Sequence, residues 1–211
     1  MSPTLLVRRT LDAGVSQVVP AGLSGMLGEI DRLDRARWYA LPDLPWTGRP
    51  PGTHGRVLVG PTGVFLLDHR SWTGEVTVRH DLLRISGRSR DPYVADLLEA
   101  ADSVAALLPA DYHALVRPVM CLTRQSRLDL LTGHVRVCSP DTLGRILARG
   151  PDLLAAEHRE YVESVVRAAT KLETEGIVVE VRPRPLGRFE QGRPEQDARE
   201  ELGEGPAAVA V

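Results

Sequence analysis

The chain has 211 residues, 43% of them hydrophobic, and a formal net charge of −2 at pH 7. This length suits one well-buried domain with appendages, and the near-neutral total gives the chain as a whole no attraction for nucleic acids or anionic membranes. No stretch approaches the ~20 apolar residues of a membrane span, and Arg8, Arg9 and Asp12 stand where a secretory signal would be apolar. The composition therefore predicts a cytoplasmic protein without membrane contact.

Two residue types carry further information. Lys171 is the only lysine among 26 basic residues, which indicates the codon bias of a GC-rich, bacterial-like genome. An arginine can therefore occupy a position where chemistry would favour lysine. Cys121 and Cys138 lie in apolar, strand-like runs without the CxxC spacing of a zinc site, so we expect buried free thiols rather than a disulfide or metal ligands.

The first 22 residues predict an N-terminal arm or an extra hairpin, with β-like fragments at 5–7 and 15–19 around a turn signal at 12–14. A helix is expected at 24–37, because Ser24 is a suitable N-cap and apolar residues recur at helical spacing. Glu29 lies beside this apolar stripe. It would therefore either follow the edge of the core or remain solvated.

The stretch from Gly55 to Arg70 predicts a hairpin at the centre of the fold. Two apolar runs, at 57–59 and 64–67, flank the turn signal Pro61-Thr62-Gly63. Continuous apolar runs are typical of strands covered by helices on both faces. The second strand ends in Asp68, His69 and Arg70, and alternation places His69 on the side opposite to its two neighbours.

The remaining elements alternate between strands and helices. A strand is expected at 37–41, a Pro- and Gly-rich loop at 42–54 and a second hairpin at 75–85 around His80-Asp81. Strands are also expected at 115–122, 135–138 and 177–181, and helices at 91–108, 140–149 and 152–174. Residues 186–211 are rich in Gly, Glu, Arg and Pro and predict a disordered acidic tail. Residues 23–182 thus predict one α/β (mixed α+β) domain with a central mixed sheet flanked by helices.

The pair Gly28-Glu29, the run VGPTGVFLLD and the following Trp72-Thr73-Gly74 together resemble the nuclease-related domain (NERD) family, a branch of the PD-(D/E)XK restriction-endonuclease-like fold. The resemblance is strongest over residues 23–125. It implies Mg²⁺-dependent phosphodiester cleavage, in which carboxylates from separate elements hold the metal and a lysine stabilises developing charge. It also implies DNA or RNA as the partner.

Carried over to this chain, the family pattern makes Glu29, Asp68 and Arg70 the catalytic candidates and Glu29 and Asp68 the candidate ligands of a weakly bound Mg²⁺. The aspartate expected before V-G-P falls at Gly55, and Glu-x-Lys becomes Asp68-His69-Arg70. A glutamine expected after Asp91-Pro92 falls at Ala95. Arginine pairs with phosphate but does not act as a base. These departures predict a degenerate site in a protein that binds or processes nucleic acid.

Alternatives follow from the same residues. Asp43 or His54 would supply the missing ligand, although imidazole is a poor partner for Mg²⁺. Arg84 and Arg88, with Arg90 and His80, would line a phosphate-binding edge beside the second hairpin, or would simply be solvated. An active Mg²⁺-dependent nuclease and a protein-interaction module without nucleic-acid contact are the competing functions. The oligomeric state is left open.

Overall fold

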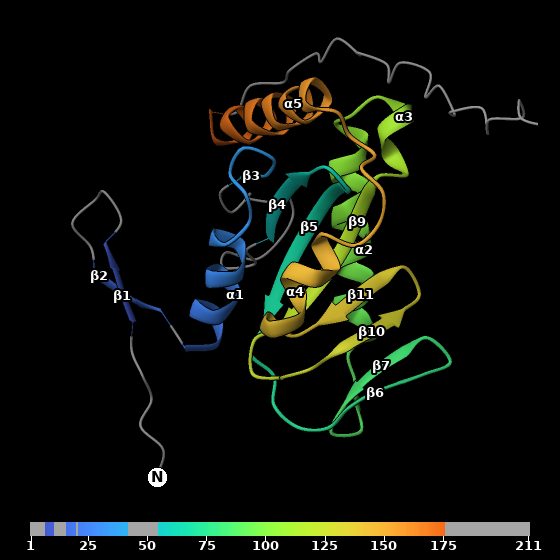
Figure 1. Cartoon of the computed structure of the whole chain (residues 1–211). Coiled ribbons are helices and arrows are strands. Elements are labelled where there is room, and N and C mark those ends of the chain that lie inside the picture. The colour runs from blue at the N-terminus through green and yellow to red at the C-terminus, as the bar shows by residue number, and fades with distance from the viewer. Residues whose placement is uncertain (1–6, 11–15, 20, 42–54, 176–211) are drawn as a thin grey trace, which may run out of the picture.

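The computed structural model describes residues 7–10, 16–19, 21–41 and 55–175. The loop at 42–54, the strand expected at 177–181 and the acidic tail lie outside the described residues. The described chain forms a mixed α/β fold in which helices flank a central sheet, as the sequence predicts (Figure 1). No helix in these ranges is long and apolar enough to cross a membrane.

The central sheet has six strands in the order β10-β11-β9-β5-β4-β3. Its centre is the predicted hairpin, β4 (Gly55–Gly60) and β5 (Gly63–Arg70), whose strands pair antiparallel. Strand β9 (Val116–Leu122) runs parallel to β5, and β11 (Val135–Cys138) runs parallel to β9. The edges are β3 (Tyr39–Ala40) and β10 (Asp129–Thr132). The expected strands at 115–122 and 135–138 are confirmed, the strand expected at 37–41 is shorter, and β10 was not predicted.

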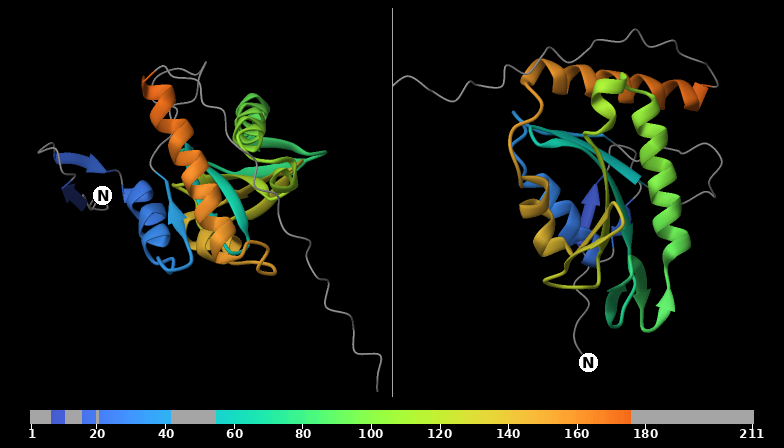
Figure 2. Two further views of the ribbon diagram at one scale, coloured as in Figure 1. Left: turned by 90° about the horizontal axis from the view of Figure 1, so that it is seen from above. Right: turned by 90° about the vertical axis from the view of Figure 1, so that its right-hand side faces the viewer.

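The two faces of the sheet bury separate cores, because successive side chains of a strand point to opposite sides. Val64 and Leu66 of β5 face the core that contains residues of α2 (Asp91–Ala106) and α5 (Ala156–Glu175). Phe65 and Leu67 face the other core, formed with α1 (Ala21–Asp31) and α4 (Pro140–Leu147). We call these the α2 face and the α1 face. Figure 2 shows helices on both sides of the sheet.

The second hairpin forms as predicted but belongs to a separate three-stranded sheet. Strands β6 (Val76–Arg79) and β7 (Leu82–Ile85) join through His80 and Asp81, whose φ angles of 51° and 60° suit a tight hairpin turn. Strand β8 (Arg88–Ser89) pairs with β7. Because Leu83 and Ile85 are buried in the core of the α2 face, this small sheet packs beside α2.

Two expected helices have wrong boundaries. Helix α1 begins at Ala21, so Ser24 lies inside the helix rather than at its N-cap, and it ends at Asp31. Helix α5 begins at Ala156 rather than at 152. The carbonyl oxygen of Pro61 accepts hydrogen bonds from the backbone N–H groups of Leu153, at 2.7 Å, and Leu154, at 2.9 Å. These bonds hold the preceding segment against the β4–β5 turn in a non-helical conformation.

Two short elements complete the description. Near the N-terminus, β1 (Val7–Thr10) and β2 (Ser16–Val19) pair antiparallel, which agrees with the expected extra hairpin. A single helical turn, α3 (Ala110–His113), connects α2 to β9 and buries Tyr112.

Candidate functional site

The end of β5 places Asp68 and Arg70 on the α2 face and His69 on the α1 face, as alternation predicts. Asp68 lies opposite Gly55 of β4 on one side and Met120 of β9 on the other. Met120 belongs to the core of the α2 face, which agrees with this placement. The candidate acid Asp68 therefore lies on a central strand of the sheet, beside Gly55, where the family pattern would have a second aspartate.

Asp68 is 4% exposed and its carboxylate is bonded to Arg70. The Nε of Arg70 donates to Oδ2 of Asp68 at 2.8 Å, and the two side chains form an ion pair. Burial raises the pKa of Asp68 above its ordinary value, and the charge and hydrogen bond of Arg70 offset part of that rise. The carboxylate is thus desolvated and engaged by its own neighbour.

Arg70 also contacts a group of aromatic rings. Its guanidinium carbon lies 5.0 Å from the ring centroid of Tyr93 and 5.7 Å from that of Trp72. The guanidinium of Arg90 lies 4.6 Å from the centroid of Trp72, and the two rings meet edge to face at 4.9 Å. We call Arg70, Trp72, Arg90 and Tyr93 the cation–aromatic cluster.

The backbone around this cluster is fixed by contacts between distant segments. The N–H of Thr123, just after β9, donates to the carbonyl oxygen of Arg70 at 2.8 Å. The Nε2 of Gln125 donates to the carbonyl oxygen of Gly74 at 2.9 Å, which holds the loop that carries Trp72. The N–H of Arg90 donates to the carbonyl oxygen of Leu83 at 2.8 Å. Hydrogen bonds therefore fix both segments that carry the cluster, the loop after β5 with Trp72 and the start of α2 with Arg90.

Glu29 lies on the other face of the sheet. It belongs to α1, whose buried residues Met26, Leu27 and Ile30 pack in the core of the α1 face. Its Oε1 forms an ion pair with Arg32. A Cβ added at Gly144 of α4 would lie 3.2 Å from its Oε2, so the carboxylate lies against α4.

The direction of α1 also separates Glu29 from Asp68 and Arg70. At the start of α1, a Cβ added at Gly22 would lie 2.1 Å from the carbonyl oxygen of Thr123, whose N–H bonds to Arg70. The start of the helix is therefore at the same end of the sheet as Arg70. Glu29 lies about 10 Å further along the axis, at ~1.5 Å per residue. The structure joins Asp68 to Arg70 and does not bring Glu29 to them.

This arrangement does not fit the Mg²⁺ site that the resemblance implies. Mg²⁺ requires carboxylate oxygens that converge on one octahedral centre, whereas Glu29 and Asp68 lie on opposite faces of the sheet and are engaged by arginines. Gly55 adds no ligand beside Asp68. Within the described ranges no group of three or more His, Cys, Asp or Glu residues is placed to hold a metal ion. Asp43 and His54 lie outside those ranges.

The predicted nucleic-acid-binding arginines lie on the small sheet. Arg84 of β7 and Arg88 of β8 are exposed on neighbouring strands, and Arg84 Nη1 donates to the carbonyl oxygen of Gly87 at 3.0 Å. Arg90 follows β8 directly. The structure therefore connects this basic edge, through Arg90 and Trp72, to the Asp68–Arg70 pair.

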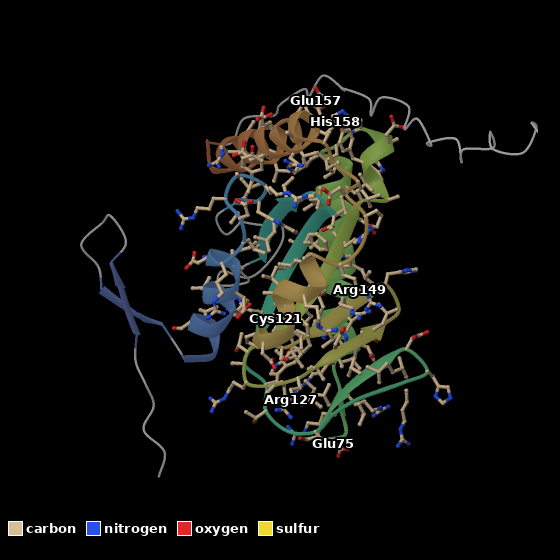
Figure 3. The ribbon with its side chains drawn as sticks, in the orientation of Figure 1. Glu75, Cys121, Arg127, Arg149, Glu157 and His158 are labelled. Carbon is tan, nitrogen blue, oxygen red and sulfur yellow. The ribbon has the colours of Figure 1, made fainter. Side chains whose placement is uncertain are left out.

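The other candidates have structural positions. Ala95 is exposed on α2, and His69 lies in register with Cys121 of β9 on the α1 face. Both cysteines are free and buried, which confirms the expectation for the thiols. Cys121 lies behind α4 near the end of the strands (Figure 3).

Comparisons with models of known protein families, with curated proteins and with solved structures found no match to this chain.

Sequence reasoning did not select Tyr93 or join Arg90 to Trp72. The signal for Tyr93 is its position in the first turn of α2, three residues after Arg90, which places both side chains at the start of one helix. Nothing in the local sequence indicates that this helix start lies against the loop after β5.

Proposed function

We propose that this chain is a nuclease-related protein, similar to the NERD family, that binds DNA or RNA in the cytoplasm and has lost metal-dependent cleavage. The resemblance rests on the VGPTGVFLLD hairpin, which lies at the centre of the sheet. The mixed α/β architecture is compatible with a restriction-endonuclease-like core.

One observation carries the proposal of a binding protein rather than a nuclease. The candidate acid Asp68 is buried, accepts a hydrogen bond from Arg70 at 2.8 Å and faces away from the side of the sheet that carries Glu29. Arg70 stands where the family pattern has lysine, and a guanidinium does not give up a proton near neutral pH. This constellation therefore lacks converging carboxylates, and it has an arginine in place of the lysine.

Arginines around the same end of β5 support nucleic-acid binding. Arg84 and Arg88 are exposed on the small sheet, and Arg90 and Arg70 lie around Trp72. Arginine donors suit phosphate groups, and phosphate contacts supply most of the sequence-independent affinity of nucleic-acid-binding proteins. The net charge of −2 predicts that this attraction is local rather than a property of the whole surface.

The test measures binding and cleavage with the full chain. Labelled single-stranded and double-stranded DNA and RNA are titrated at ~50 mM and ~200 mM salt, where phosphate-mediated affinity differs strongly. The same substrates are incubated with Mg²⁺ or Mn²⁺, using wild type and Asp68→Ala. We expect salt-dependent binding and no metal-dependent cleavage.

Two results would overturn the proposal in different ways. Cleavage that requires a divalent metal and disappears in Asp68→Ala would identify an active nuclease. Absence of binding to every substrate at low salt would remove the nucleic-acid function and favour a protein-interaction module.

A further inference from the structure

We propose that Arg90, together with Arg70, forms a binding site for one phosphate group of a nucleic acid. The inference rests on the proposed nucleic-acid-binding function and names the group that the site takes. The sequence resemblance assigns no role to Arg90, and the site is built from the cation–aromatic cluster.

Arg90 is a charged group without a polar partner in the described part of the chain. Its Nε is buried there without a hydrogen-bond partner, and its side chain forms no ion pair with a described residue. Burial has removed water from the Nε of this guanidinium, and no protein acceptor replaces that water. The loss of this hydrogen bond costs free energy. Nη1 and Nη2 of Arg90 are not among the buried unpartnered atoms, so an anion can reach these two donors and compensate the charge of the guanidinium.

The acidic side chains close to Arg90 and Arg70 in the sequence are already engaged. Asp91, the next residue, accepts the N–H of Leu83 at 3.1 Å with Oδ1, and Ser89 bonds to its Oδ2. Asp68 accepts the Nε of Arg70. Neither carboxylate is paired with Arg90, so the charge of Arg90 is left for an external anion.

The aromatic rings fix the direction of the donors. The guanidinium of Arg90 lies 4.6 Å from the centroid of Trp72, and the backbone N–H of Arg90 is bonded to Leu83. A guanidinium that stacks on a ring keeps its planar donors directed outward, and phosphate oxygens accept two such donors at once. Less side-chain entropy is then lost when the anion binds.

Arg70 supplies a second cation at the same ring. It uses Nε for Asp68, and its Nη1 and Nη2 have no hydrogen-bond partner among the described residues. Its guanidinium carbon lies 5.7 Å from the centroid of Trp72 and 5.0 Å from that of Tyr93. Asp68 and the two rings therefore hold the guanidinium of Arg70 in place, with Nη1 and Nη2 left to bind the phosphate that Arg90 contacts.

The ligand chemistry is a phosphate, and it has two sources in a nucleic acid. An internal phosphodiester presents two unesterified oxygens, whereas a terminal 5′-phosphate presents three and carries more charge. Contacts to phosphate carry no sequence information directly. We therefore expect binding that is independent of base sequence.

The experiment compares wild type with Arg90→Ala, Arg90→Lys and Trp72→Leu in the full chain. The probe is a fluorescent single-stranded oligonucleotide of mixed sequence, with a 5′-phosphate or a 5′-hydroxyl. Arg149→Ala is the control because it removes the same charge at an exposed arginine outside the cation–aromatic cluster. Arg149 follows α4, and the last residue of α4 bonds to Thr62, just before β5. Thr62 and Arg70 are separated by the length of β5, about 20 Å at ~3.3 Å per residue.

We expect Arg90→Ala to weaken binding by about tenfold, the range for a hydrogen bond to a charged group. The slope of log affinity against log salt falls by about 0.7, one phosphate contact on a single strand. Arg90→Lys keeps the charge and the salt slope but loses paired donors, so its affinity is intermediate. Trp72→Leu weakens binding without changing the salt slope, and Arg149→Ala leaves both quantities unchanged. Thermal unfolding of each variant establishes that it is folded.

The outcomes separate the two proposals. Equal loss in Arg90→Ala and Arg149→Ala, with binding intact in wild type, overturns the phosphate site and leaves the nucleic-acid function. If wild type binds no oligonucleotide at low salt, the proposed function itself fails. A loss in Arg90→Ala confined to the 5′-phosphorylated probe assigns the site to a terminal phosphate, and an equal loss with both probes assigns it to the backbone.

Discussion

Glu29 and Asp68 lie on opposite faces of the central sheet. Glu29 belongs to a helix packed on the α1 face, whereas Asp68 points to the α2 face and is bonded to Arg70. A metal ion bound between two carboxylates requires both within a few ångströms of it. The sheet itself therefore separates the two acids that the family pattern would combine.

The first prediction concerns Glu29→Gln. Because the ion pair of Glu29 among the described residues is a local one, with Arg32 just after α1, we expect nucleic-acid affinity to change by less than about twofold. The free energy of unfolding should change by less than about 1 kcal/mol, as for other surface ion pairs, because Arg32 is exposed. Oligonucleotide titration and urea unfolding measure the two quantities. A large loss of binding in this variant would show that the α1 face takes part.

The second prediction concerns the Asp68–Arg70 pair. Removing either partner leaves the other charge poorly solvated, so we expect Asp68→Ala and Arg70→Ala each to destabilise the fold by about 3 kcal/mol. The double variant should lose less free energy of unfolding than the sum of the two single losses, and the difference, the coupling energy, should be about 1–3 kcal/mol. Urea unfolding of wild type, the two single variants and the double variant completes this double-mutant cycle. Additive costs would mean that the 2.8 Å contact contributes nothing to stability.

The third prediction concerns pH. The pKa of Asp68 is raised in the folded state, chiefly by burial, so the folded protein keeps this proton at a pH where the unfolded chain has lost it. The contribution of Asp68 to stability is therefore fully present below its ordinary pKa of 3.8, and it declines as pH rises through the folded pKa.

Asp68→Asn removes this titration and leaves the other carboxylates in place. We expect the stability of wild type minus that of the variant to fall as pH rises from about 3, and then to become constant once the folded pKa is passed. Urea unfolding between pH 3 and pH 7 measures this difference. A difference that increases with pH would mean that Arg70, rather than burial, dominates the pKa of Asp68.

The central hairpin could be predicted because its signals are local. Apolar runs on both sides of Pro61-Thr62-Gly63 specify strand, turn and strand, and a period of two places Asp68 and Arg70 on one side. The missed strand β10 has weak local signals, since Asp129, Leu130 and Leu131 are not typical strand formers. It is held by contacts from elsewhere, including an ion pair of Asp129 with Arg136 and a hydrogen bond from Thr132 to the carbonyl oxygen of Asp81.

The candidate site was predictable only in part for the same reason. Helical periodicity places Glu29 beside an apolar stripe, but it does not state which face of the sheet that stripe covers. Arg90 meets Trp72 only because the start of α2, bonded to Leu83 of the small sheet, lies against the loop after β5, which Gln125 holds in place. Such contacts between distant segments leave no period in the sequence.

The fourth prediction concerns two glycines. A Cβ at Gly60 would lie 2.3 Å from ring atoms of Trp38, so Gly60→Ala should displace the ring and destabilise the fold by about 1–3 kcal/mol. Gly28 is the control because it lies within α1 and a Cβ there meets nothing within 4 Å. Gly28→Ala should stabilise the protein by about 0.5–1 kcal/mol. Equal effects in urea unfolding would contradict the close packing of Trp38 on β4.

The fifth prediction concerns the reactivity of the cysteines. Cys121 and Cys138 are register partners on the parallel strands β9 and β11, and both are fully buried. A hydrogen bond with the neighbouring thiol and burial raise the pKa of Cys138. It therefore remains a protonated thiol, and the thiolate is the reactive form.

We expect neither cysteine to react with a chromogenic disulfide reagent in the folded protein between pH 7 and pH 9, and both to react in urea. Cys138→Ser and Cys121→Ser identify which thiol responds if one does. Because both side chains pack under α1 and α4, the reaction rate should follow unfolding rather than pH. A tenfold rise in rate with each pH unit in the folded protein would instead indicate an accessible thiol and a loosely packed α1 face.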